Sequence, residues 1–328
     1  KYPYTFQGIK GGFKYSEDSL AWDNLQFSYQ NEPYESTGSL RRFTEPIIAV
    51  RIRGRDMNLS ASAESVNGVY EISRADLKTK LSMLSGSGKI TPDKDAPSGQ
   101  ANIQGYIVLS DLEQLHPFLK EKIKEWDIRG HGNITLNYAG LLNDPLNARL
   151  SLTYQSEQTS VKNFRFDNLY LKTSQPNPYE NIFDISTLFH NGKIAVSGNI
   201  QFQNDFPFKV QGEASNVDIS KLTAELPIKD QKIAGLLTTN LFLQGNAKKT
   251  ESITGQGDIK IEQGYFVKPN FLKGIISLIL SQEYQDVVFT DAKAKLFVRN
   301  NQLRLADIFV KSSAVDLSGY GWIDMTKN

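Results

Sequence analysis

Apolar and polar residues alternate along much of this chain. The clearest alternation spans residues 193–202, and it recurs over residues 134–138, 148–154 and 292–299. Side chains alternate between the two faces of a β-strand, so each segment predicts a strand with one apolar face. Half-buried antiparallel strands have this pattern, whereas strands buried in a parallel sheet have unbroken apolar runs. The sequence therefore favours antiparallel pairing.

Three segments predict helices instead: residues 111–126, 218–226 and 270–284. Their apolar residues recur at spacings of three and four, as on one side of an amphipathic helix. We therefore predict a mainly β fold. Its centre is a long, curved antiparallel sheet, either open like a groove or packed like a β-sandwich, with a few short amphipathic helices.

A strand–helix–strand pattern occurs twice in the chain. Gly105 and Gly212 each precede an aspartate by six residues, Asp111 in the first copy and Asp218 in the second. Repeated units of this kind usually stack and share a core. With the Gly/Pro/Ser-rich segment 85–99, the repeat predicts three parts: an N-terminal β region at 1–99, a first repeat-like unit at 100–205 and a second at 206–328.

Charge and composition exclude several classes of protein. The 37 Lys and Arg residues almost balance the 36 Asp and Glu residues, which argues against a nucleic-acid-binding protein. Cysteine is absent, which excludes disulfides, cysteine metal sites and a thiol nucleophile. The longest apolar stretch, residues 271–280, is half of the ~20 residues that a bilayer requires. Because the chain begins at Lys1 rather than Met, we expect a fragment or processed form without its anchoring segment.

Motifs of catalysis are missing from the sequence. It has neither a Gly-x-Ser-x-Gly nucleophile elbow nor a Ser-x-x-Lys motif, and its Gly-x-Gly pairs lie in strand patterns. The three histidines, His116, His131 and His190, do not have the spacing of metal ligands, and we interpret them as surface or packed imidazoles. We therefore predict a protein that is not an enzyme, with no catalytic residues, metal site or cofactor.

Two features allow both a structural and a functional interpretation. Arg51, Arg53 and Arg55 alternate, so on a strand they would share one face, either solvated or close to anionic lipid head groups. The helix predicted near residue 275 is apolar on more than one narrow stripe. It either covers one end of the sheet or meets lipid or a partner protein. Its candidate contact residues are Phe271, Leu272, Ile275, Ile276 and Ile279.

The region 212–325 resembles the C-terminal region of AsmA-like proteins, a family related to TamB. The resemblance rests on Gly255-Gln-Gly257 followed by Ile261 and Gly264, then a helix and a strand, and on the final Gly319-Tyr-Gly-Trp-Ile-Asp324 segment. These motifs are structural and contain no catalytic residue. The resemblance covers about a third of the chain; residues 105–152 look like a weaker copy.

The resemblance implies a periplasmic cell-envelope protein of diderm bacteria, tethered to the inner membrane in its full-length form. Proteins of this family are thought to hold or conduct phospholipid between the membranes in an apolar β-groove, in support of outer-membrane biogenesis. The expected partners are phospholipid or another acyl-chain lipid, an inner-membrane anchor and envelope proteins, but no nucleic acid. The candidate groove residues are Ile134, Leu136, Ile194, Val196, Ile200, Phe202, Leu241, Leu243, Leu296 and Val298.

Two other functions remain open at this point. The chain could be a scaffold for outer-membrane assembly that binds partner strands at its sheet edges. It could also act on envelope polysaccharide, which would require two carboxylates across an aromatic-lined cleft. An ordinary closed core is the structural alternative to a groove for every alternating strand.

Overall fold

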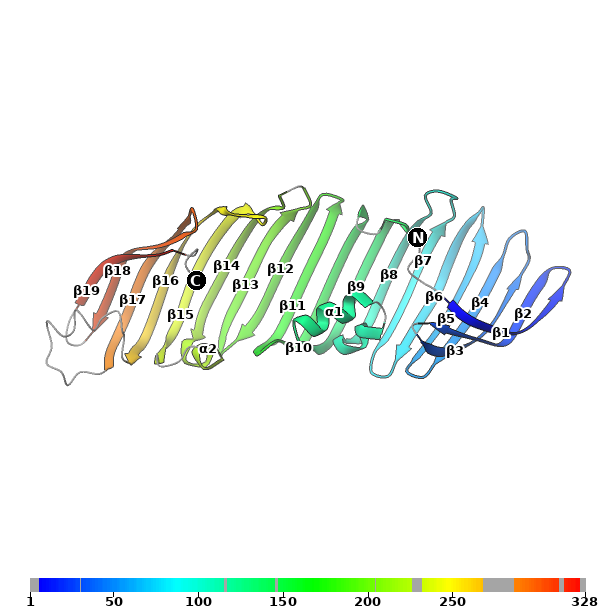
Figure 1. Ribbon diagram of the computed structural model, residues 1–328, viewed down its shortest axis with the longest axis horizontal. Coiled ribbons are helices and arrows are strands. Elements are labelled where there is room, and N and C mark those ends of the chain that lie inside the picture. Colours follow the sequence, from blue (N-terminus) through cyan, green and yellow to red (C-terminus); the bar gives the residue numbers. More distant parts are fainter. Residues whose placement is uncertain are drawn as a thin grey trace. The chain divides into compact units, whose positions relative to one another are not determined.

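The computed structural model describes residues 6–29, 31–114, 117–144, 147–203, 205–225, 232–267, 286–312 and 316–324 (Figure 1). All 19 strands belong to one antiparallel sheet. Among the described strands, β1 (Phe6–Ser16) pairs only with β2 (Ser19–Tyr29), and β19 (Asp316–Asp324) pairs only with β18 (Gln302–Ser312). The sheet is therefore open, and the predicted mainly β fold is confirmed as a single sheet rather than a sandwich.

The chain folds as two compact units. Unit 1 comprises residues 1–162 and 172–178, and unit 2 comprises residues 163–171 and 179–328, so that β11 (Phe164–Asn177) has residues in both. The three-part division at residues 99 and 205 stays a prediction.

In unit 1 each strand from β1 to β10 pairs with the next one along the chain. After β1 and β2 its elements are β3 (Glu32–Arg41), β4 (Ile47–Gly54), β5 (Met57–Val66), β6 (Val69–Thr79), β7 (Met83–Thr91), β8 (Ser98–Val108), the 3-10 helix η1 (Leu109–Gln114), α1 (Pro117–Glu125), β9 (Ile128–Leu141) and β10 (Arg149–Val161).

Unit 2 has the same antiparallel order, with each strand from β12 to β19 paired to the next. Its elements before β18 are β12 (Glu180–Phe189), β13 (Gly192–Gln201), β14 (Pro207–Asp218), α2 (Ile219–Glu225), β15 (Lys232–Asn246), β16 (Lys249–Val267) and β17 (Asp286–Arg299). The 193–202 alternation thus forms β13, as predicted, up to Gln201.

Residues with a left-handed backbone conformation form the tight turns between neighbouring antiparallel strands. The two-residue turns His190-Asn191 and Asn300-Asn301 have φ values of 46° and 68°, and of 51° and 56°. Positive φ at both central residues matches the right-handed twist of the flanking strands, and Asn tolerates this conformation better than most residues. Such short turns fix the register and hence the face of every side chain.

The helices differ in part from their prediction. The expected continuous helix at 111–126 is wrong, because η1 ends at Gln114 and α1 begins at Pro117. Proline lacks the backbone N–H that a helix interior needs and disfavours the helical conformation of the residue before it, so it suits a first helical position. The helix predicted at 218–226 is present as α2, whereas the one predicted at 270–284 lies outside the described residues.

Several buried apolar side chains lie on the helices or on the strands next to them. Ile107 of β8 and Ile123 of α1 are buried in unit 1, where α1 and η1 pack on each other and on β9. In unit 2, Val217 and Ile219 are buried where α2 packs against β15. Figure 1 shows α2 at the ends of the strands rather than across their middle. Within the described part of the chain, no helix is long and apolar enough to cross a bilayer.

Candidate binding face

The candidate functional site is the apolar face of the sheet, which the register assembles row by row. In unit 2, Val196 lies opposite Gly212, which lies opposite Leu241. The full row contains Ile185, Val196, Gly212, Leu241, Gly257, Leu296 and Leu305. Three predicted groove residues from three separate strands therefore share one row.

A second row runs beside the first. It contains Phe183, Gly198, Val210, Leu243, Gly255, Val298 and Leu303. Ile194 lies opposite Ala214, and Ile200 lies opposite Phe208, in the rows on either side. Phe202 follows the end of β13 and is exposed, and its N–H donates to the carbonyl of Tyr179. Seven of the ten predicted groove residues are thus on the apolar face of unit 2 strands.

Unit 1 has an apolar face of the same kind. Ile134 and Leu136 of β9 lie opposite Tyr154 and Leu152 of β10. On its other side, Leu136 lies opposite Ile103 of β8. These are the two predicted groove residues of this unit, and both are on its apolar face.

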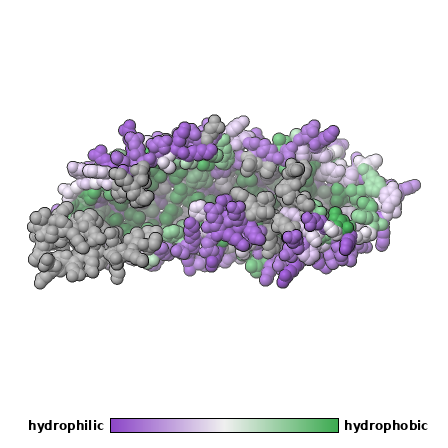
Figure 2. Space-filling view, viewed as in Figure 1, coloured by the Kyte–Doolittle hydropathy of each residue, from purple (hydrophilic) through white to green (hydrophobic). Residues whose placement is uncertain are grey.

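The apolar rows are only half-buried. Ile194, Val196, Leu241, Leu296 and Val298 all have intermediate exposure, although each has strands on both sides. Figure 2 shows apolar side chains over unit 2 in a hollow bordered by hydrophilic residues. A side chain at the centre of a sheet is fully buried only when a second layer covers it. Across the described residues, this face is an accessible apolar surface.

Large side chains lie over glycines on neighbouring strands. A Cβ atom at Gly38 would lie 2.2 Å from the Trp22 ring, and one at Gly264 would lie 2.1 Å from the Phe289 ring. Gly212 is different, because a Cβ atom there would meet no atom within 4 Å. A new side chain at Gly212 would therefore project into the open apolar face.

The arginine stripe is shorter than predicted. Arg51 and Arg53 share the polar face of β4, opposite the face of Val50 and Ile52, but β4 ends at Gly54 and leaves Arg55 in the following turn. The expectation that all three extend from one strand is therefore wrong. Glycine ends this strand where the Tyr34 ring occupies the space that a Cβ atom would need. A head-group role for the arginines stays a prediction, and the apolar residues near 275 lie outside the described residues.

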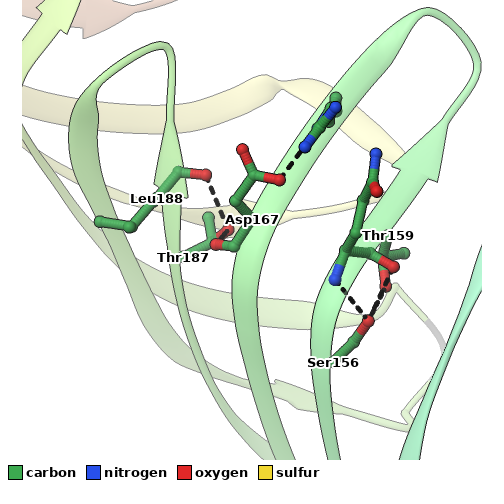
Figure 3. Close-up of polar contacts among 7 residues, drawn as sticks. Ser156, Thr159, Asp167, Thr187 and Leu188 are labelled. Atoms are coloured by element: carbon green, nitrogen blue, oxygen red, sulfur yellow. Dashed lines mark hydrogen bonds and ion pairs between the residues drawn. The ribbon is translucent and has the colours of Figure 1, made fainter.

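Polar clusters that the sequence did not reveal stabilise the strand ends. Buried Asp111 of η1 accepts hydrogen bonds from the hydroxyls of Thr79 and Ser82. In β10, the Ser156 hydroxyl accepts a hydrogen bond of 3.0 Å from Thr159 (Figure 3). In unit 2, Thr187 donates to the carbonyl of Asp167 over 2.9 Å (Figure 3). The hydrogen bonds of Asp111 and Thr187 link residues of different elements and hold them together.

Several charges on the polar face form ion pairs, among them Lys260 with Glu262 and Lys295 with Asp307. The Lys295 ammonium lies 2.9 Å from the Asp307 carboxylate, and this hydrogen bond raises the pKa of Lys295.

At the start of α2, Asp218 accepts hydrogen bonds from the hydroxyl and the N–H of Ser220, and the hydroxyl contact is the main cause of a lowered Asp218 pKa. The described residues contain no group of three or more metal-ligating side chains.

The two described histidines differ in exposure, because His190 is packed and His131 is exposed. The ring of His190 lies 4.0 Å from that of Phe189, and its Nε2 atom is 3.1 Å from Glu225 of α2. The His131 ring contacts the Tyr106 ring at 5.9 Å. His116 lies outside the described residues.

Comparisons with known proteins give no match among family models, curated proteins or solved structures.

Proposed function

We propose that this chain is a non-enzymatic binding protein that holds acyl chains of phospholipid on the apolar face of its sheet. The observation that carries the proposal is the half-exposed apolar row through Val196, Leu241 and Leu296. Aliphatic side chains and glycines match an acyl chain, which needs no directed hydrogen bonds. The resemblance to AsmA-like and TamB-related proteins supports a periplasmic location and transfer of phospholipid between the envelope membranes.

An acyl chain on this face gains free energy in proportion to the apolar area that it covers. Covering apolar surface gains about 25 cal/mol per Å², or about 0.8 kcal/mol for each fully buried methylene. A chain lying on an open sheet is covered on one side only, so ten methylenes would gain roughly 4 kcal/mol. Several rows side by side could hold the two chains of one phospholipid.

The test is to purify the protein from a diderm host without detergent and to measure bound lipid by native mass spectrometry and solvent extraction. We expect near-stoichiometric phospholipid. Substitution Gly212→Phe places a ring in open space on the apolar face and should remove most bound lipid without unfolding the protein. The matched control is Gln211→Phe, which adds the same ring to the opposite face of the same strand.

A second substitution separates a binding surface from a closed core. Val196 is half-exposed, so Val196→Asp should remain folded while reducing lipid occupancy. Unfolding of Val196→Asp would contradict an open face. A folded wild-type protein without lipid would contradict the proposal and favour the scaffold function.

A further inference from the structure

The polar face of unit 2, opposite the acyl-binding rows, has a continuous depression. Two hollows of about 780 Å³ and about 510 Å³ adjoin there, and both are lined by Glu213, Asn240 and Asp258. These three residues lie side by side on β14, β15 and β16. Each hollow has the volume of a small-molecule site, for which about 300–1,000 Å³ is usual.

Side-chain length explains the larger hollow. Its floor has the short side chains of Ala195, Ser215 and Thr238, while Lys193 and Lys260 border it. Long polar side chains normally cover a solvated sheet face. Their replacement by Ala, Ser and Thr over three neighbouring strands leaves a dish with hydroxyl groups on its floor.

Aromatic rings border the smaller hollow. Phe242 and Phe297 are 36% and 40% exposed and lie on either side of Gln256 in one register row. They are two strands apart, which corresponds to about 10 Å. Exposed rings within a polar face are unfavourable in water, and their apolar faces suit stacking against a ligand.

The other lining groups offer hydrogen bonds in both directions. Asn240 and Gln256 present amide donors and acceptors, and the carboxylates of Glu213 and Asp258 accept. Three lysines line the hollows, Lys193 and Lys260 in the larger one and Lys295 in the smaller one. Lys260 lies 2.6 Å from Glu262, and Lys295 lies 2.9 Å from Asp307. With Glu213 and Asp258 the charges nearly balance, which disfavours a polyanion and suits a neutral ligand with many hydroxyl groups.

We propose that this depression binds a neutral oligosaccharide, whose rings stack on Phe242 and Phe297 and whose hydroxyls bond to Asn240, Glu213 and Asp258. The hollow is a shallow part of an open face, and the proposal is binding with no bond cleaved. The chain would then bind lipid on one face and a glycan on the other. The glycan site does not depend on the acyl-binding proposal.

The experiment is isothermal titration calorimetry of the full chain with cellohexaose and chitohexaose, and with an oligogalacturonate as the acidic comparison. We expect one of the neutral probes to bind, and Phe242→Ala or Phe297→Ala to weaken it by roughly tenfold. The matched control is Phe309→Ala, which removes a ring of 39% exposure from the same face outside both hollows. Circular dichroism confirms that each variant is folded.

Gly212→Phe separates the two proposals, because it should remove lipid and leave oligosaccharide affinity unchanged. The glycan proposal is overturned if neither neutral probe binds at millimolar concentration, if only the acidic probe binds, or if Phe309→Ala weakens binding as much as Phe242→Ala. Release of shorter sugars, detected by chromatography, would overturn a pure binding role and assign Glu213 and Asp258 to hydrolysis.

Discussion

Asp111 is the polar residue whose removal should cost the most stability. Its side chain is 6% exposed and one carboxylate oxygen accepts three hydrogen bonds: from the Thr79 hydroxyl at 2.5 Å, the Ser82 hydroxyl at 2.7 Å and the Leu81 N–H at 3.3 Å. Ser82 in turn accepts from the N–H of Val108. The cluster therefore joins the β6–β7 turn to η1 and to the end of β8.

Substitution Asp111→Ala removes all three acceptor contacts at once. A hydrogen bond to a charged group contributes about 1.5–3 kcal/mol, and a buried donor left without a partner costs about 1–3 kcal/mol. The Leu81 contact is long and water can replace it, so the two hydroxyls dominate. We expect a loss of about 3 kcal/mol in the free energy of unfolding, a large part of the 5–15 kcal/mol typical of a domain.

Urea unfolding followed by circular dichroism measures the global loss, and hydrogen exchange measures the local one. A loss of about 3 kcal/mol corresponds to roughly 150-fold faster exchange of the Ser82 and Val108 amides. The control is Asp95→Ala, at an exposed loop carboxylate. A loss below about 1 kcal/mol in the free energy of unfolding, or an equal loss in the control, would refute the conclusion that this cluster stabilises the contact of the β6–β7 turn with η1 and β8.

Two further predictions concern single contacts in unit 2. Gly264→Val should lower the unfolding temperature by several degrees, because the new side chain would occupy the position of the buried Phe289 ring. The control Gly319→Val places the same side chain in open space and should change the unfolding temperature little. Differential scanning calorimetry compares the two variants. Asp218→Ala should cost about 1 kcal/mol at pH 7 through loss of the α2 cap. The pKa of Asp218 is lowered in the folded state, so its contribution to the free energy of unfolding is present above the unfolded-state pKa of about 4 and is lost as pH falls through the folded-state pKa. The free energies of unfolding of the wild type and Asp218→Ala, measured in urea, should therefore converge at low pH. A difference that stays constant with pH would contradict the lowered pKa.

Strands and their faces could be predicted from the sequence because the signal is local. Alternation at residues 193–202 placed Ile194, Val196 and Ile200 on one face, and β13 has that arrangement. The exposed ring of Phe297 also had a signal, since it interrupts the polar positions of the 292–299 segment. An aromatic residue at a polar position of the alternation therefore predicted an exposed ring.

Contacts between distant segments could not be predicted in this way. Asp111 meets Thr79 across 32 residues, and nothing in either segment specifies that pairing. The depression on the polar face also depends on residues that are far apart in the sequence. The strand register brings its short side chains together from β13, β14 and β15. The start of α1 at Pro117 did have a local signal in the proline itself, which the apolar stripe outweighed in the prediction.

The distribution of burial explains how each unit can leave an apolar face accessible. Each strand pairs with its neighbour in sequence, so stability accumulates from adjacent hairpins, as it does in repeat proteins. Tight side-chain packing is concentrated at positions such as Val217 and Phe289, which are 2% and 1% exposed. Midstrand positions such as Val196 and Gly212 are then free of the requirement to form a closed core. Substitutions there should alter what the protein binds more than whether it folds, and this separation allows the proposed acyl-binding and glycan-binding faces to be tested independently.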